Sequence, residues 1–332
     1  MIQKRVVLIA DRVNNHQNAT LEMNNLEVLD DDYFIPLYQT LKNISPSVVH
    51  YESPAEFTEQ ICIHKEDIVL SVWSGTGSRS RRALVPAICE ANKIAYVGAD
   101  SFLQALCQDK DLSKSFAKKY GINSPKGILI YSSNDFHKLD LLTYPIIIKP
   151  NYEGGSIGIF NCSVVQNANE ASSLAKRLLY TYSPLLAEEY ILGEEISFCL
   201  AGTRSQLSLF EVIRQYINGR KFFHHEIMGA EYKKISEDPQ LWDNVTSSIC
   251  PDLKKLITDF YFHLGKAELI RIDGRINEAG FFLIELSTDV GLSRKSTMTQ
   301  AFESAGKTYE EMLEQIISNS IQSSECQNAN ML

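Results

Sequence analysis

The segment Tyr144-Pro-Ile-Ile-Ile-Lys149-Pro-Asn-Tyr-Glu-Gly154-Gly155-Ser156-Ile-Gly158 joins a short apolar run to a turn rich in glycine and serine. A lysine inside an apolar strand needs an anionic partner, because an unpaired buried charge is very costly. The glycines allow backbone N–H groups to approach a ligand closely, which is how backbone loops hold phosphate. By itself the segment fits two interpretations: a nucleotide phosphate site, or an edge strand followed by a hairpin turn.

Composition and charge are those of a globular protein without a dedicated nucleic-acid surface. The chain has 332 residues, of which 44% are hydrophobic and 22% charged, so it can bury a large core and form two or three subdomains. Its net charge of −9 argues against a nucleic-acid-binding domain, which would be basic. Such acidity is compatible with anion binding in local basic pockets.

The cysteines and apolar segments predict a soluble, cytoplasmic protein without a membrane partner. The seven cysteines are scattered, odd in number and include no Cys-x-x-Cys pair, which favours reduced thiols over disulfides or a zinc site. The apolar part of the N-terminal segment, Val6–Ala10, is too short for a signal peptide. No run approaches the roughly 20 apolar residues that a membrane helix needs.

Residues 1–100 alternate predicted strands and helices. The continuous apolar run Val6–Ala10 is typical of a buried strand in a parallel sheet. This alternation predicts a doubly wound α/β subdomain, in which ligands bind beyond the carboxyl ends of the strands. The other strands are expected at Ser47–Tyr51, Asp67–Trp73 and Ile94–Val97, and the helices at Asp32–Asn43 and Arg82–Asn92.

Two α+β subdomains are expected to follow, at residues 101–192 and 193–320, with a disordered tail at residues 321–332. The first begins with one long predicted helix, Ser101–Tyr120, and a strand is expected after the glycine-rich turn, at Ile157–Phe160. Its other elements are predicted at Gly127–Tyr131, the lysine segment, Asn169–Tyr180 and Leu185–Tyr190. Those of the last subdomain are predicted near Ile196–Ala201, Leu207–Tyr216, Pro251–Leu264, Leu269–Ile276, Phe281–Leu286 and Tyr309–Ile317.

Two apolar strands of the last subdomain carry polar residues at alternate positions. In Leu269-Ile-Arg271-Ile-Asp273 and Leu283-Ile-Glu285-Leu-Ser287 the polar side chains of each strand share one face. If the strands are neighbours, Asp273, Glu285 and Ser287 converge beside Arg271. Hard oxygen ligands of this kind suit Mg²⁺ held jointly with triphosphate oxygens. An outward-facing polar stripe on an antiparallel pair fits the same spacing.

Two further segments carry hydrogen-bonding groups at the ends of predicted elements. Ala187–Glu195 follows a strand and could hold an adenine through its backbone and a ribose through a carboxylate, or it could be a solvated acidic turn. Gly291–Thr297 is rich in donors and precedes a helix, so it could bind a carboxylate or phosphate, or could only cap that helix.

Taken in order, these segments resemble the ATP-grasp superfamily and, within it, the D-alanine–D-alanine ligase family. The resemblance extends from about Tyr96 to Ile317. The segments that carry it are Asp109-Lys110-x-x-x-Lys114, Ile148-Lys149-Pro150 with Glu153-Gly-Gly-Ser156-x-Gly158, Glu188-Glu-Tyr-Ile with Gly193-x-Glu195, Arg271-x-Asp273, Glu285-x-Ser287-x-x-x-Gly291, and Ser296. It implies an ATP-grasp fold whose last two subdomains enclose ATP, and a homodimer as the assembly.

The resemblance also implies roles for individual residues. The implied ATP contacts are Lys110, Lys149, Gly154, Gly155 and Ser156 at the phosphates, Glu188 and the backbone of Tyr190 and Ile191 at the adenine, Glu195 at the ribose, and Glu189 as a further cofactor-binding residue. The implied ligands of Mg²⁺, with Mn²⁺ as an alternative, are Asp273, Glu285 and Ser287. The implied catalytic residues are Arg271, Lys149 and Ser156, and the substrate contacts are Arg271, Ser293, Ser296 and Arg79.

The implied activity is an ATP-dependent carboxylate–amine ligase for amino acids or amino-acid-like substrates. A carboxylate would attack the γ-phosphate, and an amine would attack the resulting acyl phosphate while Arg271 stabilises the oxyanion. The closed glycine loop would exclude water. Two alternatives remain: a catalytically weak nucleotide-binding regulator, and an ester-forming ligase using a hydroxy acid, which His224 and His225 suggest.

The chain departs from the family pattern in four places. Ser287 stands where the family has asparagine as a metal ligand. Ile9–His16 lacks the family's early acidic motif, and Trp73–Arg82 has an arginine cluster in place of an acid. These arginines, Arg79 among them, lead us to expect a first substrate with extra negative charge rather than D-alanine. The family's Lys-Tyr pair over the phosphates aligns with either Phe222–Gly229 or Glu231–Lys234.

Overall fold

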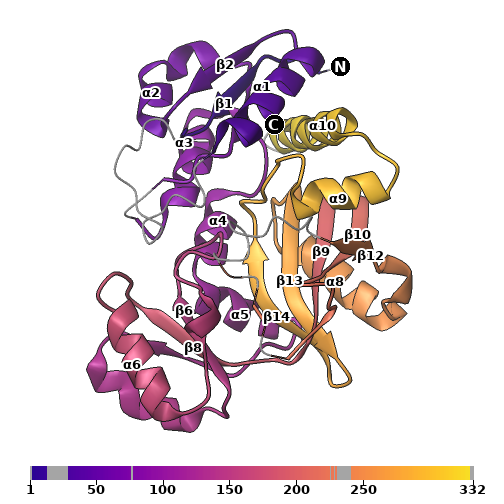
Figure 1. The fold of residues 1–332 in the computed structure, drawn as a ribbon. Helices are drawn as coiled ribbons and strands as arrows, with labels where there is room; N and C mark the ends of the chain where they lie inside the picture. The colour runs from indigo at the N-terminus through magenta and orange to yellow at the C-terminus, as the bar shows by residue number, and fades with distance from the viewer. Residues whose placement is uncertain are drawn as a thin grey trace.

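Three sheets make up the fold of the computed structural model, which describes residues 2–12, 29–75, 78–224, 226–227, 229 and 241–329. A parallel sheet, a small antiparallel sheet and a larger antiparallel sheet follow one another along the chain (Figure 1). The predicted fold class, an α/β subdomain followed by α+β subdomains, is thus confirmed. No helix of the described ranges is long and apolar enough to cross a membrane.

The N-terminal sheet is parallel, in the order β2-β1-β3-β4. Its central strand is β1 (Val6–Ile9), which is buried throughout, as its apolar run predicts. Its neighbours are β2 (Val48–Tyr51), β3 (Ile68–Ser71) and β4 (Ala95–Tyr96). The associated helices are α1 (Asp31–Ile44), α2 (Pro54–Glu59), η2 (Ile61–His64), η3 (Arg81–Ala83) and α3 (Leu84–Asn92).

The middle sheet is antiparallel, in the order β5-β8-β6-β7. Its strands are β5 (Gly127–Ile130), β6 (Ile146–Pro150), β7 (Val164–Val165) and β8 (Leu185–Glu189). The segments between these strands form the 3-10 helices η4 (Ser133–Leu141) and η5 (Asn161–Ser163) and the α-helix α6 (Ala168–Leu178). Ile146 and Ile148 pack in one core with α6, so alternation directs Lys149 to the opposite face, where Glu188 of β8 also lies.

The large sheet has the order β12-β10-β9-β13-β14, with β11 paired to β9. Its strands are β9 (Gly193–Gly202), β10 (Leu207–Gln215), β11 (Phe222–Phe223), β12 (Trp242–Asn244), β13 (Leu269–Asn277) and β14 (Gly280–Ser287). The accompanying helices are α4 (Ser101–Gln108), α5 (Lys110–Lys118), η6 (Thr246–Ser248), α8 (Pro251–His263), α9 (Thr297–Ser304) and α10 (Tyr309–Ala329).

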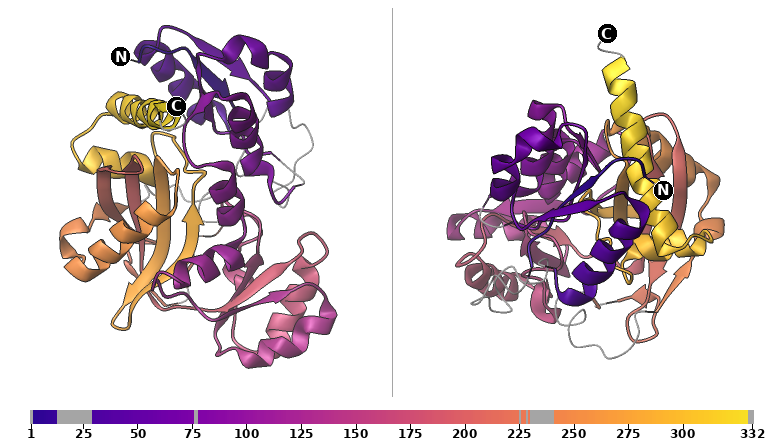
Figure 2. Two further views of the ribbon diagram at one scale, coloured as in Figure 1. Left: turned by 180° about the vertical axis from the view of Figure 1, so that it is seen from behind. Right: turned by 90° about the horizontal axis from the view of Figure 1, so that it is seen from above.

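The N-terminal sheet and the large sheet share one hydrophobic core. Val6 and Leu8 of β1, Leu37 of α1, Leu269 of β13 and Ile316 of α10 belong to the same buried cluster. The helix α10 therefore returns to the N-terminal sheet and lies beside α1 and β4 (Figures 1 and 2). The expectation of a disordered tail at residues 321–332 is wrong for 321–329, because α10 continues to Ala329 and Ile321 packs against this core.

Two other expectations about local structure are wrong. The predicted helix Ser101–Tyr120 is two helices, because Asp109 is extended and its carboxylate accepts from the N–H of Leu112 as the N-cap of α5. Ile157–Phe160 is no strand but part of two successive turns. Gly155, Ser156 and Gly158 have positive φ angles of 57°, 66° and 71°, which a strand cannot accommodate.

A glycine stands where the register of the β13–β14 pair shifts, next to the predicted metal residue Asp273. The ladder shifts between Asp273 and Gly274, and a Cβ at Gly274 would overlap the ring of Phe281 and the carbonyl oxygen of Phe282. Position 274 therefore has no room for a side chain.

We expect Gly274→Ala to lower the free energy of unfolding by about 1–3 kcal/mol, because overpacking displaces the Phe281 ring or the strand. Urea denaturation followed by circular dichroism measures the loss. Gly291→Ala is the control, since a Cβ there makes only an ordinary contact of 3.7 Å with Ser296. Equal stability of the two variants would contradict the packing argument.

Candidate active site

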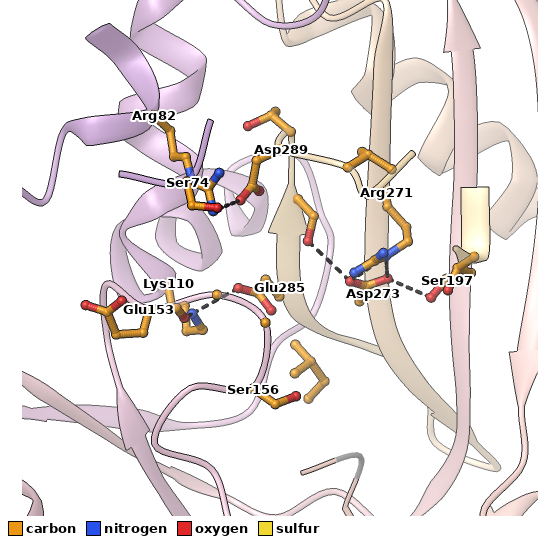
Figure 3. Close-up of a pocket in the computed structure, with 18 of the residues that line it drawn as sticks. Ser74, Arg82, Lys110, Glu153, Ser156, Ser197, Arg271, Asp273, Glu285 and Asp289 are labelled. Atoms are coloured by element: carbon orange, nitrogen blue, oxygen red, sulfur yellow. Dashed lines mark hydrogen bonds and ion pairs between the residues drawn. The ribbon is translucent and has the colours of Figure 1, made fainter. Parts of the chain in front are cut away.

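A cavity of about 500 Å³ lies where the three sheets meet. Its lining includes Lys149 from the middle sheet. Figure 3 shows Ser74 and Arg82 from the N-terminal unit and Arg271 and Glu285 from the large sheet, which also line it. Charged groups from distant parts of the sequence thus face one space. The predicted site residues that line it are Lys110, Lys149, Gly154, Gly155, Ser156, Glu188, Glu189, Tyr190, Ile191, Glu195, Arg271, Asp273, Glu285 and Ser287.

Two lysines meet one carboxylate in the buried wall of this cavity. Lys149 Nζ lies 2.5 Å from Glu188 Oε1, and Lys114 Nζ donates to Glu188 Oε2. Burial lowers the pKa of Lys114 to about 8, although Glu188 opposes this shift. Burial alone would raise the pKa of Glu188, but the charges of Lys114 and Lys149 outweigh it and lower that pKa. The result is a buried group with net positive charge at neutral pH, suited to an anion.

These contacts give Glu188 a role other than the adenine contact implied by the resemblance. The side chain is 1% exposed and its carboxylate faces both lysines. It fixes two cations at the cavity wall. The neighbouring Glu189 points elsewhere, and its Oε1 accepts from the backbone N–H of Thr143 at 2.9 Å.

A third lysine connects the two halves of the site. Lys110, the first residue of α5, places its Nζ 2.9 Å from Glu285 Oε1 of β14 and donates to the backbone oxygen of Glu153. Burial would raise the pKa of Glu285, but Lys110 and the other nearby cations lower it. Lys110 therefore joins the start of the glycine-rich loop to an acid of the large sheet (Figure 3).

The convergence predicted for the two polar strands occurs. Arg271 pairs with Ser287, and Asp273 with Glu285, in the β13–β14 ladder. Arg271 Nε lies 2.7 and 2.9 Å from the two carboxylate oxygens of Asp273. Ser287 Oγ donates to Asp273 at 3.3 Å.

Sequence reasoning missed a further partner of this carboxylate. Ser197 Oγ donates to Asp273 Oδ1 at 2.6 Å, from the opposite residue of β9 (Figure 3). No local pattern marks Ser197, because its place follows from the pairing of β9 with β13.

The glycine-rich loop covers one side of the cavity. Its residues Gly154, Gly155 and Ser156 line the space, in turns closed by Ile157 N–H to Gly154 O at 2.9 Å and Ile159 N–H to Ser156 O at 3.1 Å. Gly158 must remain a glycine, because a Cβ would overlap the Pro150 ring. The loop thus has the left-handed backbone and small residues that a phosphate-covering loop needs.

The segment after β8 forms another wall, organised by an arginine that the sequence did not single out. Arg275 donates to the carbonyl oxygen of Ile191 at 2.7 Å and lies 3.3 Å from Glu195 Oε2. Its guanidinium also stacks on the Tyr190 ring, 4.4 Å from the centroid. Arg275 continues the alternate-position pattern of Arg271 and Asp273, which is the signal that could have identified it.

Three predicted substrate contacts do not line the cavity. Ser296 is the N-cap of α9, where its Oγ accepts from Thr299 N–H at 3.3 Å, and Ser293 O accepts from the Thr299 hydroxyl. Of the two interpretations of Gly291–Thr297, the cap of a helix is thus the one that the contacts of Ser296 fit. Arg79 is exposed and donates to Tyr152 Oη at 3.3 Å. Arg271 is the predicted substrate contact that does line the cavity.

The other two arginines of the cluster face acids of the chain itself. Arg81 Nη2 lies 2.9 Å from Glu153 Oε2, and Arg82 Nη2 lies 3.2 Å from Asp289 Oδ2. Arg82 and Asp289 line the cavity, and sequence reasoning did not identify Asp289.

The loop predicted to supply the Lys-Tyr pair is described only in part. His224 donates its backbone N–H to Glu226 Oε2 at 2.8 Å. His225, Met228 and the alternative segment Glu231–Lys234 lie outside the described residues.

The donor set fits a metal that is shared with phosphate oxygens better than one held by protein alone. Asp273, Glu285 and Ser287 supply hard oxygen ligands on one face. Within the described ranges no three His, Cys, Asp or Glu side chains form a metal-binding group. Both carboxylates already contact cations, Arg271 and Lys110, so additional anionic ligands would be needed to hold a metal.

More than half of the chain, residues 118–318, matches the protein family described as D-ala D-ala ligase C-terminus. The D-alanine--D-alanine ligase of Pediococcus pentosaceus is 24% identical over 300 residues, covering 90% of this chain and 77% of that protein. The D-alanine--D-alanine ligase A of Bacillus cereus is 25% identical over 258 residues, covering 77% and 82%. The crystal structure of D-alanine--D-alanine ligase from Bacillus anthracis complexed with ATP has a TM-score of 0.71 at 21% identity, covering 98% and 99%.

We expect Glu188→Gln to lower the free energy of unfolding by about 3 kcal/mol, because Lys114 and Lys149 would remain buried without their carboxylate. Urea denaturation measures the change. Glu189→Gln, in the adjacent and less buried position, should cost well under half as much. Similar losses in the two variants would refute the role of Glu188 as the counter-ion of the lysines.

The lowered pKa of Lys114 predicts a pH dependence of stability. Its folded pKa of about 8 lies below the unfolded value of 10.5, so the unfolded chain binds more protons between these values. The contribution of Lys114 to the free energy of unfolding should therefore rise as pH increases above about 8. The measurement is the slope of the free energy of unfolding against pH, between pH 7 and 9, in wild type and in Lys114→Gln. The wild-type slope should be the larger of the two. A difference of zero or of opposite sign would contradict the shift.

Proposed function

Because the chain belongs to the D-alanine–D-alanine ligase family and is thus an ATP-dependent ligase, we propose that it joins the carboxylate of one amino-acid-like substrate to the amine of another through an acyl phosphate. One observation carries the proposal: two lysines, Lys110 and Lys149, a glycine-rich loop and the Arg271–Asp273–Glu285 group all face one cavity. The lysines come from the middle unit and α5, whereas the arginine and the acids come from the large sheet.

The lysine side of the cavity is proposed to bind the triphosphate. Lys149 and Lys110 neutralise phosphate charge, and Gly154 to Ser156 cover the γ-phosphate. Glu188 and Lys114 hold Lys149 in the wall. Adenine then lies along the segment from Glu189 to Ile191, with the ribose near Glu195.

The large sheet is proposed to carry the acyl transfer. A carboxylate oxygen attacks the γ-phosphorus, the bond to the β–γ bridging oxygen breaks, and ADP leaves. The amine nitrogen of the second substrate then attacks the acyl carbon, the bond to the phosphate oxygen breaks, and phosphate and a proton are released. Arg271 donates to the oxyanion that forms at the acyl carbon.

Asp273, Glu285 and Ser287 are proposed to hold Mg²⁺ together with phosphate oxygens. When bound, the ion would neutralise phosphate charge at the point of transfer. The hydroxyl of Ser287 is a weaker ligand than a carboxamide, so a single metal is the proposed stoichiometry.

Neutral amino-acid-like molecules are the proposed first substrates. The arginine cluster led us to expect a negatively charged first substrate. In the structure, however, Glu153 balances the charge of Arg81, and Asp289 balances that of Arg82. Much of the cavity wall on the N-terminal side is apolar, with Val72, Val85 and Pro86 among its residues.

The test is an assay of ADP release over a panel of D- and L-amino acids and acidic metabolites. We expect neutral amino acids to stimulate ADP release in wild type, and Arg271→Gln to lower kcat by about 100-fold or more because one oxyanion donor is lost. ATP affinity should change little. Arg214→Gln, on a strand of the same sheet and outside the cavity lining, is the control. ATP binding without any stimulated turnover would indicate a regulator instead.

A further inference from the structure

The short helix η3 (Arg81–Ala83) carries two arginines that contact two different loops of the site, one at Glu153 and one at Asp289. Arg81 is 4% exposed and does not line the cavity, yet its guanidinium meets Glu153 at 2.9 Å. Glu153 directly precedes Gly154, where the phosphate-covering loop begins. Arg81 can therefore influence that loop without touching a ligand.

Arg82 makes the corresponding contact with the other loop. It pairs with Asp289 at 3.2 Å (Figure 3). It also donates to the carbonyl oxygen of Trp73 at 3.0 Å. Asp289 lies between Ser287, at the end of β14, and Gly291 on the same cavity wall. The two loops thus contact adjacent residues of one helix.

The base of the phosphate-covering loop is held at several points. Gln108 and Lys110 donate to the backbone oxygens of Tyr152 and Glu153, respectively. Arg79 donates to the Tyr152 hydroxyl at 3.3 Å and lies 5.9 Å from its ring centroid. Each of these groups comes from outside the middle sheet, so the loop is fixed by the parts of the protein that it closes against.

We propose that Arg81 is a positioning residue that latches the phosphate-covering loop to the N-terminal unit, and that Arg82 ties the same helix to the loop at Asp289. The inference rests on the proposed function, because the loop is taken to cover ATP. If the loop moved away, Arg81 would lose the carboxylate that balances its charge, although its Nη1 also donates to the neutral carbonyl oxygen of Ser78 at 3.3 Å. Breaking a buried ion pair is costly. The pair therefore shifts the loop toward the closed state.

The latch has a chemical consequence at the acyl phosphate. Water that reaches this intermediate attacks it and returns the carboxylate and phosphate, so ATP is consumed without product. A loop held by Arg81 and Glu153 excludes that water. Loss of the pair is thus expected to weaken ATP binding and also to raise the ratio of ADP to ligated product.

The test compares Arg81→Gln, Glu153→Gln, Arg81→Lys and the charge swap Arg81→Glu with Glu153→Arg. Calorimetry with a non-hydrolysable ATP analogue and Mg²⁺ gives Kd, and product analysis with the best amino acid of the panel gives the ratio of ADP to product. Both glutamine variants should raise Kd about tenfold and raise the ratio above one. The lysine variant and the swap should recover part of each loss.

Arg5→Gln is the matched control, because Arg5 pairs with Asp67 at 2.7 Å in the same N-terminal unit and lies outside the cavity lining. It should leave Kd and the product ratio unchanged. If wild type binds the analogue and both glutamine variants keep the wild-type Kd and product ratio, the latch is overturned while the proposed function stands. The same conclusion follows if the charge swap restores neither quantity beyond the values of the glutamine variants. Absence of analogue binding in wild type would overturn the proposed function and the latch with it.

Discussion

The buried contact of Glu188 with Lys114 and Lys149 is the constraint on which the site depends. The buried ammonium groups of Lys114 on α5 and Lys149 on β6 would repel each other and lose their hydration, so the carboxylate between them stabilises the fold. One carboxylate against two cations leaves an excess of positive charge beside the cavity. The same arrangement that makes the lysines tolerable therefore makes the cavity attractive to a polyanion.

In the large sheet the groups that need partners are carboxylates rather than ammonium groups. Asp273 receives hydrogen bonds from Arg271, Ser197 and Ser287, which come from three adjacent strands. The direction of the carboxylate is thereby fixed, and Lys110 fixes Glu285 in a similar way. Lys110 belongs to α5, whose start is set by the helix break at Asp109. A small interruption between two helices thus aligns the acidic strands with the glycine-rich loop.

The sequence predicted the parts of the site that arise from spacing within one element. Alternate positions in a strand share a face, so Arg271 with Asp273, and Glu285 with Ser287, could be paired from sequence. Contacts that arise between elements could not be predicted in this way. Ser197 reaches Asp273 only through the pairing of β9 with β13. The extended backbone at Asp109 was missed because helix-forming residues on both sides concealed a cap.

The arginine cluster shows why a charged side chain cannot be assigned to a ligand from sequence alone. Its partner can be another side chain of the same protein. Arginines at the edge of a predicted site indicate an anionic substrate, and an anionic side chain of the same protein satisfies them equally well. Glu153 and Asp289 lie more than 70 and 200 residues from their partners, too far along the chain for any local pattern to relate them. Their pairing balances the charges of Arg81 and Arg82 and connects these two arginines to two loops that border the cavity. Arg81 and Arg82 thus join the N-terminal unit to the other two parts of the protein, and under the proposed function substrate selection falls to the other residues of the cavity wall.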